Sequence, residues 1–346
     1  MKSNRILTMA QAIAEGISQE MTRDSTVFVM GEDIGSYGGI FGATGGLLAQ
    51  FGEERIMDTP ISETAFIGAA TGAAAAGLRP VVELMFVDFF GVCMDQIYNH
   101  LAKNTYMSGG HVKLPVVLTT AIGGGYSDAA QHSQCLYGTF AHMPGIKVVV
   151  PSNAYDAKGL MIQAIRDDNP VIFMYHKGIM GLPWMAYFEG SSNGVPEESY
   201  AIPFGKAQIV KEGSDLTIVT LSQMVQKAVL AADELARQSI HAEVLDLRTL
   251  VPMDVAAILK SVRKTGRLLI ADEDYLGFGL SGEIAALIAE NLDTVTLKSP
   301  IQRLAVPNVP IPYSRPLEQF VIPQISDIVK AAQEMMLKKI AHLEPM

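Results

Sequence analysis

Residues 64–85 read TAFIGAATGAAAAGLRPVVELM, and the fold class can be inferred from this stretch. Small and apolar residues recur at spacings of three and four between Thr64 and Gly77, which predicts a helix. The largely apolar run Val81–Met85 follows a Gly-Leu-Arg-Pro break and predicts a buried strand. A helix that leads into such a strand is the repeating unit of an α/β sheet.

The same alternation extends on both sides of this unit. Before residue 178, the other predicted helices are Met9–Met21, Cys93–Asn104 and Ala154–Arg166, and the strands are Val27–Met30, Val116–Thr120, Val148–Val150 and Val171–Met174. Residues 178–204 lose this periodicity and are rich in Gly, Pro and Ser, which indicates a linker. Beyond it, the predicted strands are Leu216–Leu221, Ala242–Leu245, Leu268–Ala271 and Ile301–Ala305, and the helices are Met224–Gln238, Ala256–Val262 and Ser281–Asn291. We therefore expect two α/β domains, each a largely parallel sheet with helices on both faces.

Composition favours a soluble, cytoplasmic protein. The chain has 346 residues, of which 49% are hydrophobic, and a net charge of -10 without any run of Lys or Arg, so nucleic acid is not an expected partner. The most apolar stretch, residues 69–78, is about half as long as a membrane span, so no membrane contact is expected. The start of the sequence has no apolar run typical of a signal peptide, and two cysteines are too few for a disulfide framework.

The predicted helix 64–77 has an unusual face. Its small residues at helical spacing are Ala65, Gly68, Ala69, Gly72, Ala73 and Ala76. Each Gly costs roughly 1 kcal/mol against Ala inside a helix, which suggests that another helix approaches closely. That helix could belong to the same domain or to another subunit.

An acidic residue, Glu63, stands at the start of this helix within the segment DTPISE, residues 58–63. A carboxylate in a first helical turn is ordinarily explained by the helix dipole. Ile61, Ala65 and Phe66 flank Glu63, however, and an apolar pocket made by them would raise its pKa and let it hold or share a proton.

A second candidate element is the loop Ile122–Gln134, which follows the predicted strand Val116–Thr120 and contains three consecutive glycines. Ligands bind beyond the carboxyl ends of strands in α/β sheets, although the glycines could also form a simple turn. His132 lies in a polar run of this loop and is a candidate for proton handling. Cys135 follows closely, but no further ligands have zinc spacing.

Two other functional classes are compatible with parts of the sequence. The segment GFGLSG, residues 277–282, matches the dinucleotide fingerprint G-x-G-x-x-G and suggests a nicotinamide-dependent oxidoreductase. About 20 residues on, where the ribose-binding acid should stand, the chain has Gln302, so a loop-to-helix turn explains the glycines better. A non-catalytic scaffold or regulatory subunit is the third class, and the polar elements around Glu63 and His132 argue against it.

Several motifs occur in a familiar order: GED at 31–33, DTPISE at 58–63, DQ at 95–96, YMSGG at 106–110, QHSQ at 131–134 and DAKGL at 156–160. Over about residues 4–335 the chain resembles the β subunits of the 2-oxo acid and acetoin dehydrogenase complexes, in the transketolase-like superfamily. The resemblance implies a thiamine pyrimidine-binding domain at 1–190, with the linker from about 178, and a transketolase C-terminal-like domain at 204–335.

The resemblance also implies roles for individual residues. The family's glutamate at the Glu63 position hydrogen-bonds N1′ of the thiamine aminopyrimidine, which favours the imino tautomer whose N4′ removes the C2 proton. Met85 and Phe89 match positions that line the pyrimidine. His132 matches an active-site histidine that handles protons or orients the lipoyl group. The backbone carbonyls that match a structural potassium site are those of Val116, Ala164, Ile165, Asp167 and Asn169.

One expected motif is absent. The superfamily binds the diphosphate and magnesium through Gly-Asp-Gly followed by Asn, and this sequence has no Gly-Asp-Gly. In the family an α subunit supplies this half of the thiamine diphosphate site. The resemblance therefore implies an α2β2 heterotetramer, with magnesium held by α, that works with a lipoyl-bearing acyltransferase.

The substrate is the least determined feature. Residues 83–93 and 132–138 resemble acetoin dehydrogenase β subunits more than those for pyruvate or branched-chain 2-oxo acids. Oxo acids carry a carboxylate that needs a cation or a set of hydrogen-bond donors near the reacting carbon, whereas acetoin is neutral. Neither motif has Arg or Lys beside it in sequence, which fits acetoin, although the α subunit could supply the charge. Acetoin, cleaved to acetaldehyde with the two-carbon unit passed to a lipoyl group, is the expected substrate, and the oxo acids are the alternative.

Overall fold

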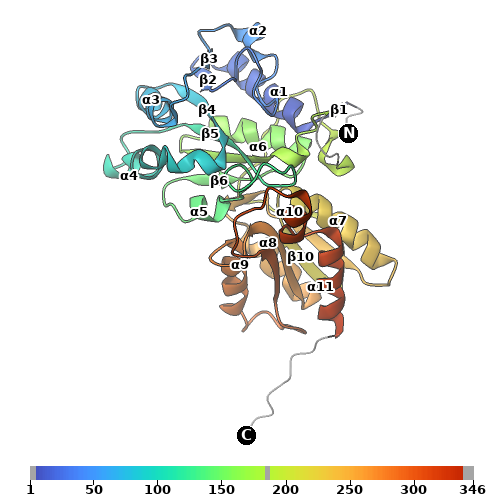
Figure 1. Ribbon diagram of the computed structural model, residues 1–346. Helices are drawn as coiled ribbons and strands as arrows, with labels where there is room; N and C mark the ends of the chain where they lie inside the picture. Colours follow the sequence, from blue (N-terminus) through green and yellow to red (C-terminus); the bar gives the residue numbers. More distant parts are fainter. Residues whose placement is uncertain (1–4, 184–187, 338–346) are drawn as a thin grey trace.

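The computed structural model describes residues 5–183 and 188–337. Figure 1 shows two lobes, with residues from the first half of the chain in one and residues from the second half in the other. Each lobe contains its own sheet, so the predicted pair of α/β domains is confirmed. No helix in these described ranges is long and apolar enough to cross a membrane.

The first sheet has seven strands in the order β12-β6-β7-β5-β4-β2-β3. Their bounds are β12 Thr249–Val251, β6 Lys147–Val149, β7 Val171–His176, β5 Val117–Ile122, β4 Arg79–Phe86, β2 Val27–Gly31 and β3 Ile56–Asp58. Every pairing is parallel except that of β12 with β6. Since β12 lies late in the chain, the second half of the sequence contributes an edge strand to the first sheet.

Helices cover both faces of this sheet. On one face α1 (Met9–Arg23) and α6 (Ala154–Arg166) bury their apolar residues in one core. On the other face α3 (Glu63–Ala75) and the π-helix η2 (Gln96–Leu101) share a core that continues into the second domain. The smaller helices of this domain are α2 Leu47–Phe51, α4 Asn104–Met107 and α5 Tyr137–Ala141.

The second sheet has five strands in the order β14-β13-β10-β11-β9. Their bounds are β14 Gln302–Val306, β13 Leu268–Tyr275, β10 Leu216–Thr220, β11 Ala242–Asp246 and β9 Gln208–Lys211, and only β9 is antiparallel. The helices are α7 Gln223–Ala236, α8 Val255–Thr265, α9 Leu280–Ala289, α10 Arg315–Val321 and α11 Ile325–Leu337. Helices α7 and α11 pack on one face, and α8 and α9 extend the core shared with the first domain.

The predicted linker at 178–204 is not a free connection. Within it β8 (Asn193–Gly194) pairs with β1 (Ile6–Leu7), and Tyr200 stacks on Tyr155 of α6 with ring centres 4.7 Å apart. Buried Lys158 donates to the carbonyls of Pro196, Glu197 and Glu198. The described part of this segment is therefore packed on the first domain, while residues 184–187 lie outside the described chain.

The helix predicted at Cys93–Asn104 is replaced by the π-helix η2 and the short helix α4. A Cβ at Gly68 of α3 would lie 2.8 Å from Oε1 of Gln96, so η2 crosses α3 at this glycine. Part of the small-residue face of α3 thus packs inside the domain. Ala65, Ala69, Gly72 and Ala76 remain exposed.

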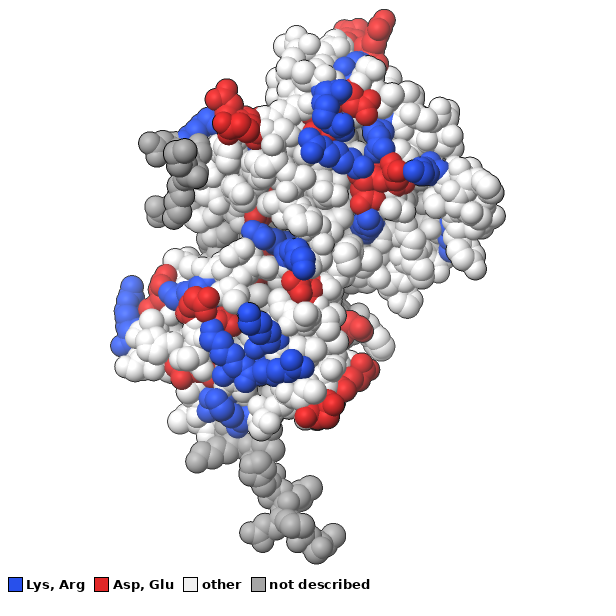
Figure 2. All heavy atoms as spheres, turned by 180° about the vertical axis from the view of Figure 1, so that it is seen from behind, with Lys and Arg blue, Asp and Glu red and all other residues white. Residues whose placement is uncertain are grey.

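The surface charge is uneven. Figure 2 shows Lys and Arg mixed with Asp and Glu over one face of the first domain, and a larger group of Lys and Arg on the second. In the second domain Lys264 of α8 contacts Glu212 at 2.8 Å and also pairs with buried Glu243. On the face shown in Figure 2, the charged residues are therefore gathered in groups and not spread evenly.

Candidate functional site

Three neighbouring strands of the first sheet, β4, β5 and β7, end at one edge. Strand β4 leads into the 3-10 helix η1 (Val87–Gly91), β5 leads into the loop Ile122–Gln134, here called the glycine loop, and β7 leads into η3 (Lys177–Ile179). Parallel strands bring such connections together at their carboxyl ends. The predicted residues Met85, Phe89 and His132 all lie at this edge.

An aromatic cluster forms where these connections meet. The His132 ring lies edge-on to Phe86 and Phe89, with ring centres 4.8 and 5.4 Å away, and the two Phe rings are 5.5 Å apart. All three side chains are half-buried, as is Met85 at the end of β4. The fold therefore brings Phe89 and His132 together. Phe86, which joins them, was missed in the sequence because it continues the apolar run of the strand.

Glu63 is the first residue of α3 and is half-buried. The Thr64 hydroxyl donates to the Val92 carbonyl at 2.6 Å, which ties the start of α3 to the end of η1. Burial, together with the charge of Glu63, raises the pKa of the neighbouring Cys93 thiol to about 12. Glu63 therefore lies beside the segment that carries Phe89.

The apolar pocket expected around Glu63 is not formed by its chain neighbours. Ile61 is 85% exposed and Ala65 is also exposed, so Phe66 is the one flanking apolar side chain that is buried. Burial, with the charges of Glu63 and Asp33, raises the pKa of nearby Glu32. This end of the site is acidic and open.

A lysine lies beside the His132 motif in space, although neither motif has Arg or Lys beside it in sequence. Lys177 is 1% exposed, and its Nζ lies 2.5 Å from both Asp128 Oδ2 and the His132 carbonyl oxygen. This contact could not be inferred from the sequence, because Lys177 lies 45 residues from His132 along the chain. The Asp128 carboxylate compensates the positive charge of Lys177.

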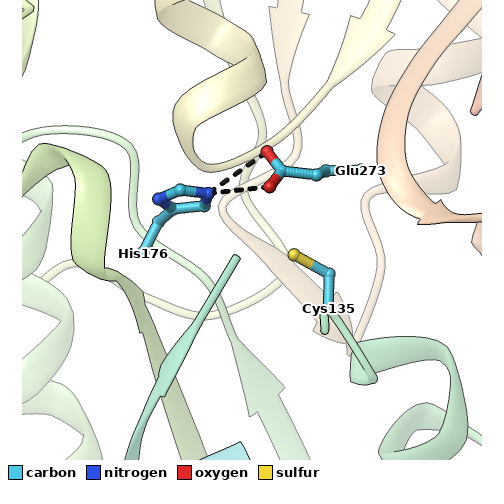
Figure 3. Close-up of side chains that lie close together, drawn as sticks. All are labelled: Cys135, His176 and Glu273. Carbon is cyan, nitrogen blue, oxygen red and sulfur yellow. Dashed lines mark hydrogen bonds and ion pairs between the residues drawn. The ribbon is translucent and has the colours of Figure 1, made fainter. Parts of the chain in front are cut away.

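Beneath the glycine loop, Cys135, His176 and Glu273 have their donor atoms within 4.8 Å of one another. Figure 3 shows the His176 ring directed at the Glu273 carboxylate, with the Cys135 sulfur to one side. His176 Nε2 is 3.1 Å from both Glu273 oxygens, and Nδ1 accepts the Gly178 N–H at 2.9 Å. Both ring nitrogens are engaged, so the cluster is a hydrogen-bonded support of the loop rather than an open metal site.

The ionisation of this cluster agrees with that interpretation. Burial alone would raise the pKa of Glu273, but His176, Lys227 and the Gly124 N–H outweigh it and lower this pKa to about 2. Burial, reinforced by Glu273, raises the pKa of the Cys135 thiol well above its usual value. An ionised carboxylate thus accepts a hydrogen bond from the Gly124 N–H of the loop beside a protonated thiol.

The residues of the expected potassium site lie at the end of α6 and at the starts of β5 and β7: Val116, Ala164, Ile165, Asp167 and Asn169. The carbonyls of Ile165 and Asp167 both accept hydrogen bonds from Arg79 Nη1, at 2.9 and 3.1 Å. The Val116 carbonyl accepts the Val171 N–H at 2.9 Å. Two of the five carbonyls therefore converge on a guanidinium, and a potassium ion stays a prediction.

The G-x-G-x-x-G segment forms the turn between β13 and α9. A Cβ at Gly279 would lie 2.0 Å from the Tyr275 carbonyl oxygen. Packing is therefore a sufficient reason for glycine at this position. Between the glycines, Phe278 has a φ of 61° and its side chain is fully exposed. The glycines are thus explained by the turn, as the position of Gln302 suggested.

Comparison with known proteins identifies both domains. Residues 6–181 match the family described as "Transketolase, pyrimidine binding domain", and residues 205–328 match "Transketolase, C-terminal domain". Among solved structures, a "Split gene transketolase, inactive beta4 tetramer" superimposes with a TM-score of 0.75 at 24% identity, covering 96% of this chain and 99% of that one. At that identity the likeness shows the fold alone.

Curated relatives define the family more narrowly. The "Acetoin:2,6-dichlorophenolindophenol oxidoreductase subunit beta" of Cupriavidus necator is 48% identical and that of Bacillus subtilis 42%, each over 96% of this chain and 98% of the relative. The "Pyruvate dehydrogenase E1 component subunit beta" of Rickettsia bellii is 44% identical over 98% of this chain and 99% of the relative. The chain therefore belongs to the family of β subunits of acetoin and 2-oxo acid dehydrogenases, an oxidoreductase family built on the two transketolase domains.

Proposed function

We propose that this chain is the β subunit of a thiamine-diphosphate-dependent acetoin dehydrogenase. It would contribute to cleaving acetoin to acetaldehyde and to passing the two-carbon unit oxidatively to a lipoyl group. The alternative substrates are pyruvate and branched-chain 2-oxo acids. The family supports the cofactor, and the edge of the first sheet supplies the residues that would meet it.

The residues at this edge fit one half of a thiamine diphosphate site. Met85 and Phe89 are half-buried, so their remaining surface is free to cover a planar ring. Glu32 Oε1 is buried and lacks a hydrogen-bond partner among the described residues. Bound thiamine diphosphate would supply a nucleophilic carbon for attack on the substrate carbonyl.

Each polar residue has a distinct task in this proposal. Glu63 would hold a proton between its carboxylate and N1′ of the aminopyrimidine ring. His132 would orient the lipoyl group or move a proton on the substrate side, since its ring lies on Phe89, the residue proposed to line the pyrimidine. The aromatic rings of Phe86 and Phe89 would exclude water from that side.

A partner must supply the other half. The sequence has no Gly-Asp-Gly motif for the diphosphate and magnesium, so we infer an α subunit that holds both in an α2β2 assembly. Two exposed apolar side chains at the open end of the site, Ile61 and Val92 beside the start of α3, support this. Exposed apolar side chains that gather at one place are typical of an interaction surface.

The observation that carries the choice of acetoin is the charge balance beside His132. Lys177 is the buried cation next to this motif, and it is already engaged by Asp128 and the His132 carbonyl. A substrate carboxylate would have to displace Asp128, whereas neutral acetoin needs a small apolar pocket and hydrogen bonds. The rings of Phe86 and Phe89 would supply the apolar wall of such a pocket.

The test is a steady-state comparison of acetoin, pyruvate and 3-methyl-2-oxobutanoate. The assembly of this chain with its α subunit would be assayed with an artificial electron acceptor. We expect acetoin to have the highest kcat/KM. A kcat/KM for pyruvate about tenfold above that for acetoin, or about 1.4 kcal/mol of transition-state preference, would reject acetoin and leave the proposed cofactor site intact.

Three further features complete the proposal. A lipoyl-bearing acyltransferase would receive the two-carbon unit.

A potassium ion would bind the carbonyls near Asp167, since a carbonyl oxygen that accepts one hydrogen bond keeps a second lone pair for a hard cation. The enzyme would act in the cytoplasm, in keeping with the unpaired state of Cys93 and Cys135.

A further inference from the structure

The backbone of the glycine loop would not keep its shape unaided. Gly123 and Gly125 have φ of +90° and +102°, and the non-glycine residues Ser127 and Ala129 have φ of 60° and 64°. A side chain in this left-handed region crowds the adjacent backbone, so the conformation is strained. Such strain persists only where surrounding groups hold the loop in place.

A carboxylate of the second domain holds the middle of this loop. The Gly125 N–H donates to Glu318 Oε1 at 2.8 Å, and the Ser127 N–H donates to Glu318 Oε2 at 3.0 Å. Glu318 lies on α10, which Figure 1 places where the two lobes meet. A Cβ at Gly124 would lie 2.5 Å from Cδ1 of Ile322, so the loop is packed directly against the end of α10.

The environment of Glu318 shows how much depends on these two contacts. Its side chain is 0% exposed, and within residues 5–183 and 188–337 it forms no salt bridge. A buried carboxylate is costly unless hydrogen bonds satisfy it, and the two loop N–H groups are the donors placed to do so. Lys227 fixes the segment after α10 by donating to the Pro323 carbonyl at 2.9 Å.

The far end of the loop is held from the first domain. Lys177 Nζ contacts Asp128 and the His132 carbonyl, as described above. The backbone on both sides of Ala129 is thus fixed, by Glu318 before it and by Lys177 after it. The His132 ring emerges from this restrained segment and lies against Phe86 and Phe89.

We propose that Glu318 is a positioning residue, which holds the glycine loop through the Gly125 and Ser127 N–H groups and thereby sets the orientation of His132. The inference rests on the proposed function, in which His132 acts on the substrate or the lipoyl group. It gives the C-terminal domain, which already supports the loop through Glu273 and the Gly124 N–H, a second contact with the segment that carries His132.

The pair of hydrogen bonds from the Gly125 and Ser127 N–H groups to Glu318 is here called the clamp. The variant Glu318→Gln tests the clamp, because the amide keeps one acceptor oxygen but presents an NH2 group to the second loop N–H. Hydrogen exchange would be followed in the complete assembly with the α subunit, on peptides that cover residues 123–128. We expect these amides to exchange at least about tenfold faster in the variant. Glu243→Gln is the control, since Glu243 is also 0% exposed in the second domain but is held by Ser261 at 2.6 Å and by Lys264 rather than by the glycine loop.

A double-mutant cycle tests whether the clamp acts through His132. Glu318→Gln alone should lower kcat about tenfold, with KM for substrate and affinity for thiamine diphosphate changed less than about twofold. In a His132→Ala background the same substitution should have little further effect on kcat. A general loss of folding would instead reduce the activity of both backgrounds by the same factor.

Each outcome decides the inference. Faster exchange at 123–128 together with a non-additive cycle supports it, whereas unchanged exchange, or independent effects of the two substitutions, overturns it. The cycle uses whichever of acetoin or pyruvate the assembly turns over, so a wrong substrate assignment leaves the result readable. Full activity of His132→Ala would reject both its proposed role and positioning through it, and the exchange data would still report on the clamp.

Discussion

The two ends of the candidate site differ in how far this chain alone builds them. At the His132 end, the imidazole contacts two Phe rings, and the loop that carries it is held by Lys177 and Glu318. At the Glu63 end, the carboxylate stands at a helix start whose neighbour Ile61 is 85% exposed. The first end is pre-organised by contacts from both domains, and the second is open.

This difference indicates where the missing subunit must act. A loop that is already fixed needs nothing further to present its histidine. A glutamate beside exposed apolar side chains gains a low-polarity environment only when another surface covers it. The partner is therefore expected to complete the Glu63 end and to leave the His132 end largely as it is.

The largest effect of a single substitution is expected at the open end. Glu63→Gln should slow hydrogen–deuterium exchange at C2 of thiamine diphosphate in the α/β assembly by about 10²–10⁴-fold, because the amide cannot share a proton with N1′. Assembly should be unaffected. The control Glu53→Gln changes an exposed carboxylate of the same domain and should leave the exchange rate as it is. Equal rates in Glu63→Gln and wild type would remove Glu63 from the mechanism.

A smaller effect is expected at the pre-organised end. His132→Ala should lower single-turnover reductive acylation of a lipoyl domain by about 10–100-fold and change cofactor affinity by less than about twofold. His142→Ala, at an exposed histidine beyond α5, serves as the control. A His132→Ala enzyme defective only in cofactor binding would contradict the role proposed for this residue.

Stability should depend on pH through a buried carboxyl beside the site. Burial raises the pKa of Glu83 to about 7, although the Tyr175 hydroxyl donates to it at 3.0 Å. A carboxyl with a raised folded-state pKa favours folding below its unfolded value of 4.5, and this stability is lost as pH rises through about 7. The loss amounts to about 3 kcal/mol at most.

Calorimetric melting at pH 5 and pH 8 measures this dependence. Glu83→Gln is neutral at both values, so the decrease in melting temperature between pH 5 and pH 8 should be smaller in this variant than in wild type. Glu283→Gln, an exposed position on α9, should melt like wild type at both pH values. An unchanged pH dependence in Glu83→Gln would show that Glu83 does not titrate as its burial predicts.

Potassium is expected to have the smallest effect. If the ion binds the carbonyls near Asp167, a concentration about ten times its Kd should add about 1.4 kcal/mol of stability. Melting in potassium chloride is therefore expected at a higher temperature than in sodium or choline chloride of equal ionic strength. Identical melting temperatures in the three salts would mean that no potassium ion binds these carbonyls and that Arg79 alone satisfies them.

The regular elements were predictable because their signals are local. Helix α6 has the predicted bounds Ala154–Arg166, and its start is fixed by Asn153, whose side chain accepts the Asp156 N–H. The alternation of apolar helices and strands likewise predicted the two sheets. Strand β12 was not predicted because its three residues pair with β6, about a hundred positions away in the chain. The π-helix η2 was predicted as an α-helix, because apolar periodicity does not distinguish the two kinds of helix.

The same distinction applies to the site. Phe89 and His132 follow strand ends, so the rule for α/β sheets brings them together from the sequence alone. Glu318 is 193 residues from Gly125, and no local pattern connects the two. The open state of the Glu63 end was anticipated from a missing motif, but the exposure of Ile61 is a tertiary property that the sequence around Glu63 does not reveal.

We propose that this chain builds one half of a thiamine diphosphate site and that the α subunit builds the other. Calorimetric titration of thiamine diphosphate with magnesium, into the isolated chain and into its assembly with the α subunit, tests it most directly. We predict that the isolated chain binds at least about 100-fold more weakly, a difference of about 2.7 kcal/mol. Tight, magnesium-dependent binding by the isolated chain would show that it holds the whole cofactor without an α subunit.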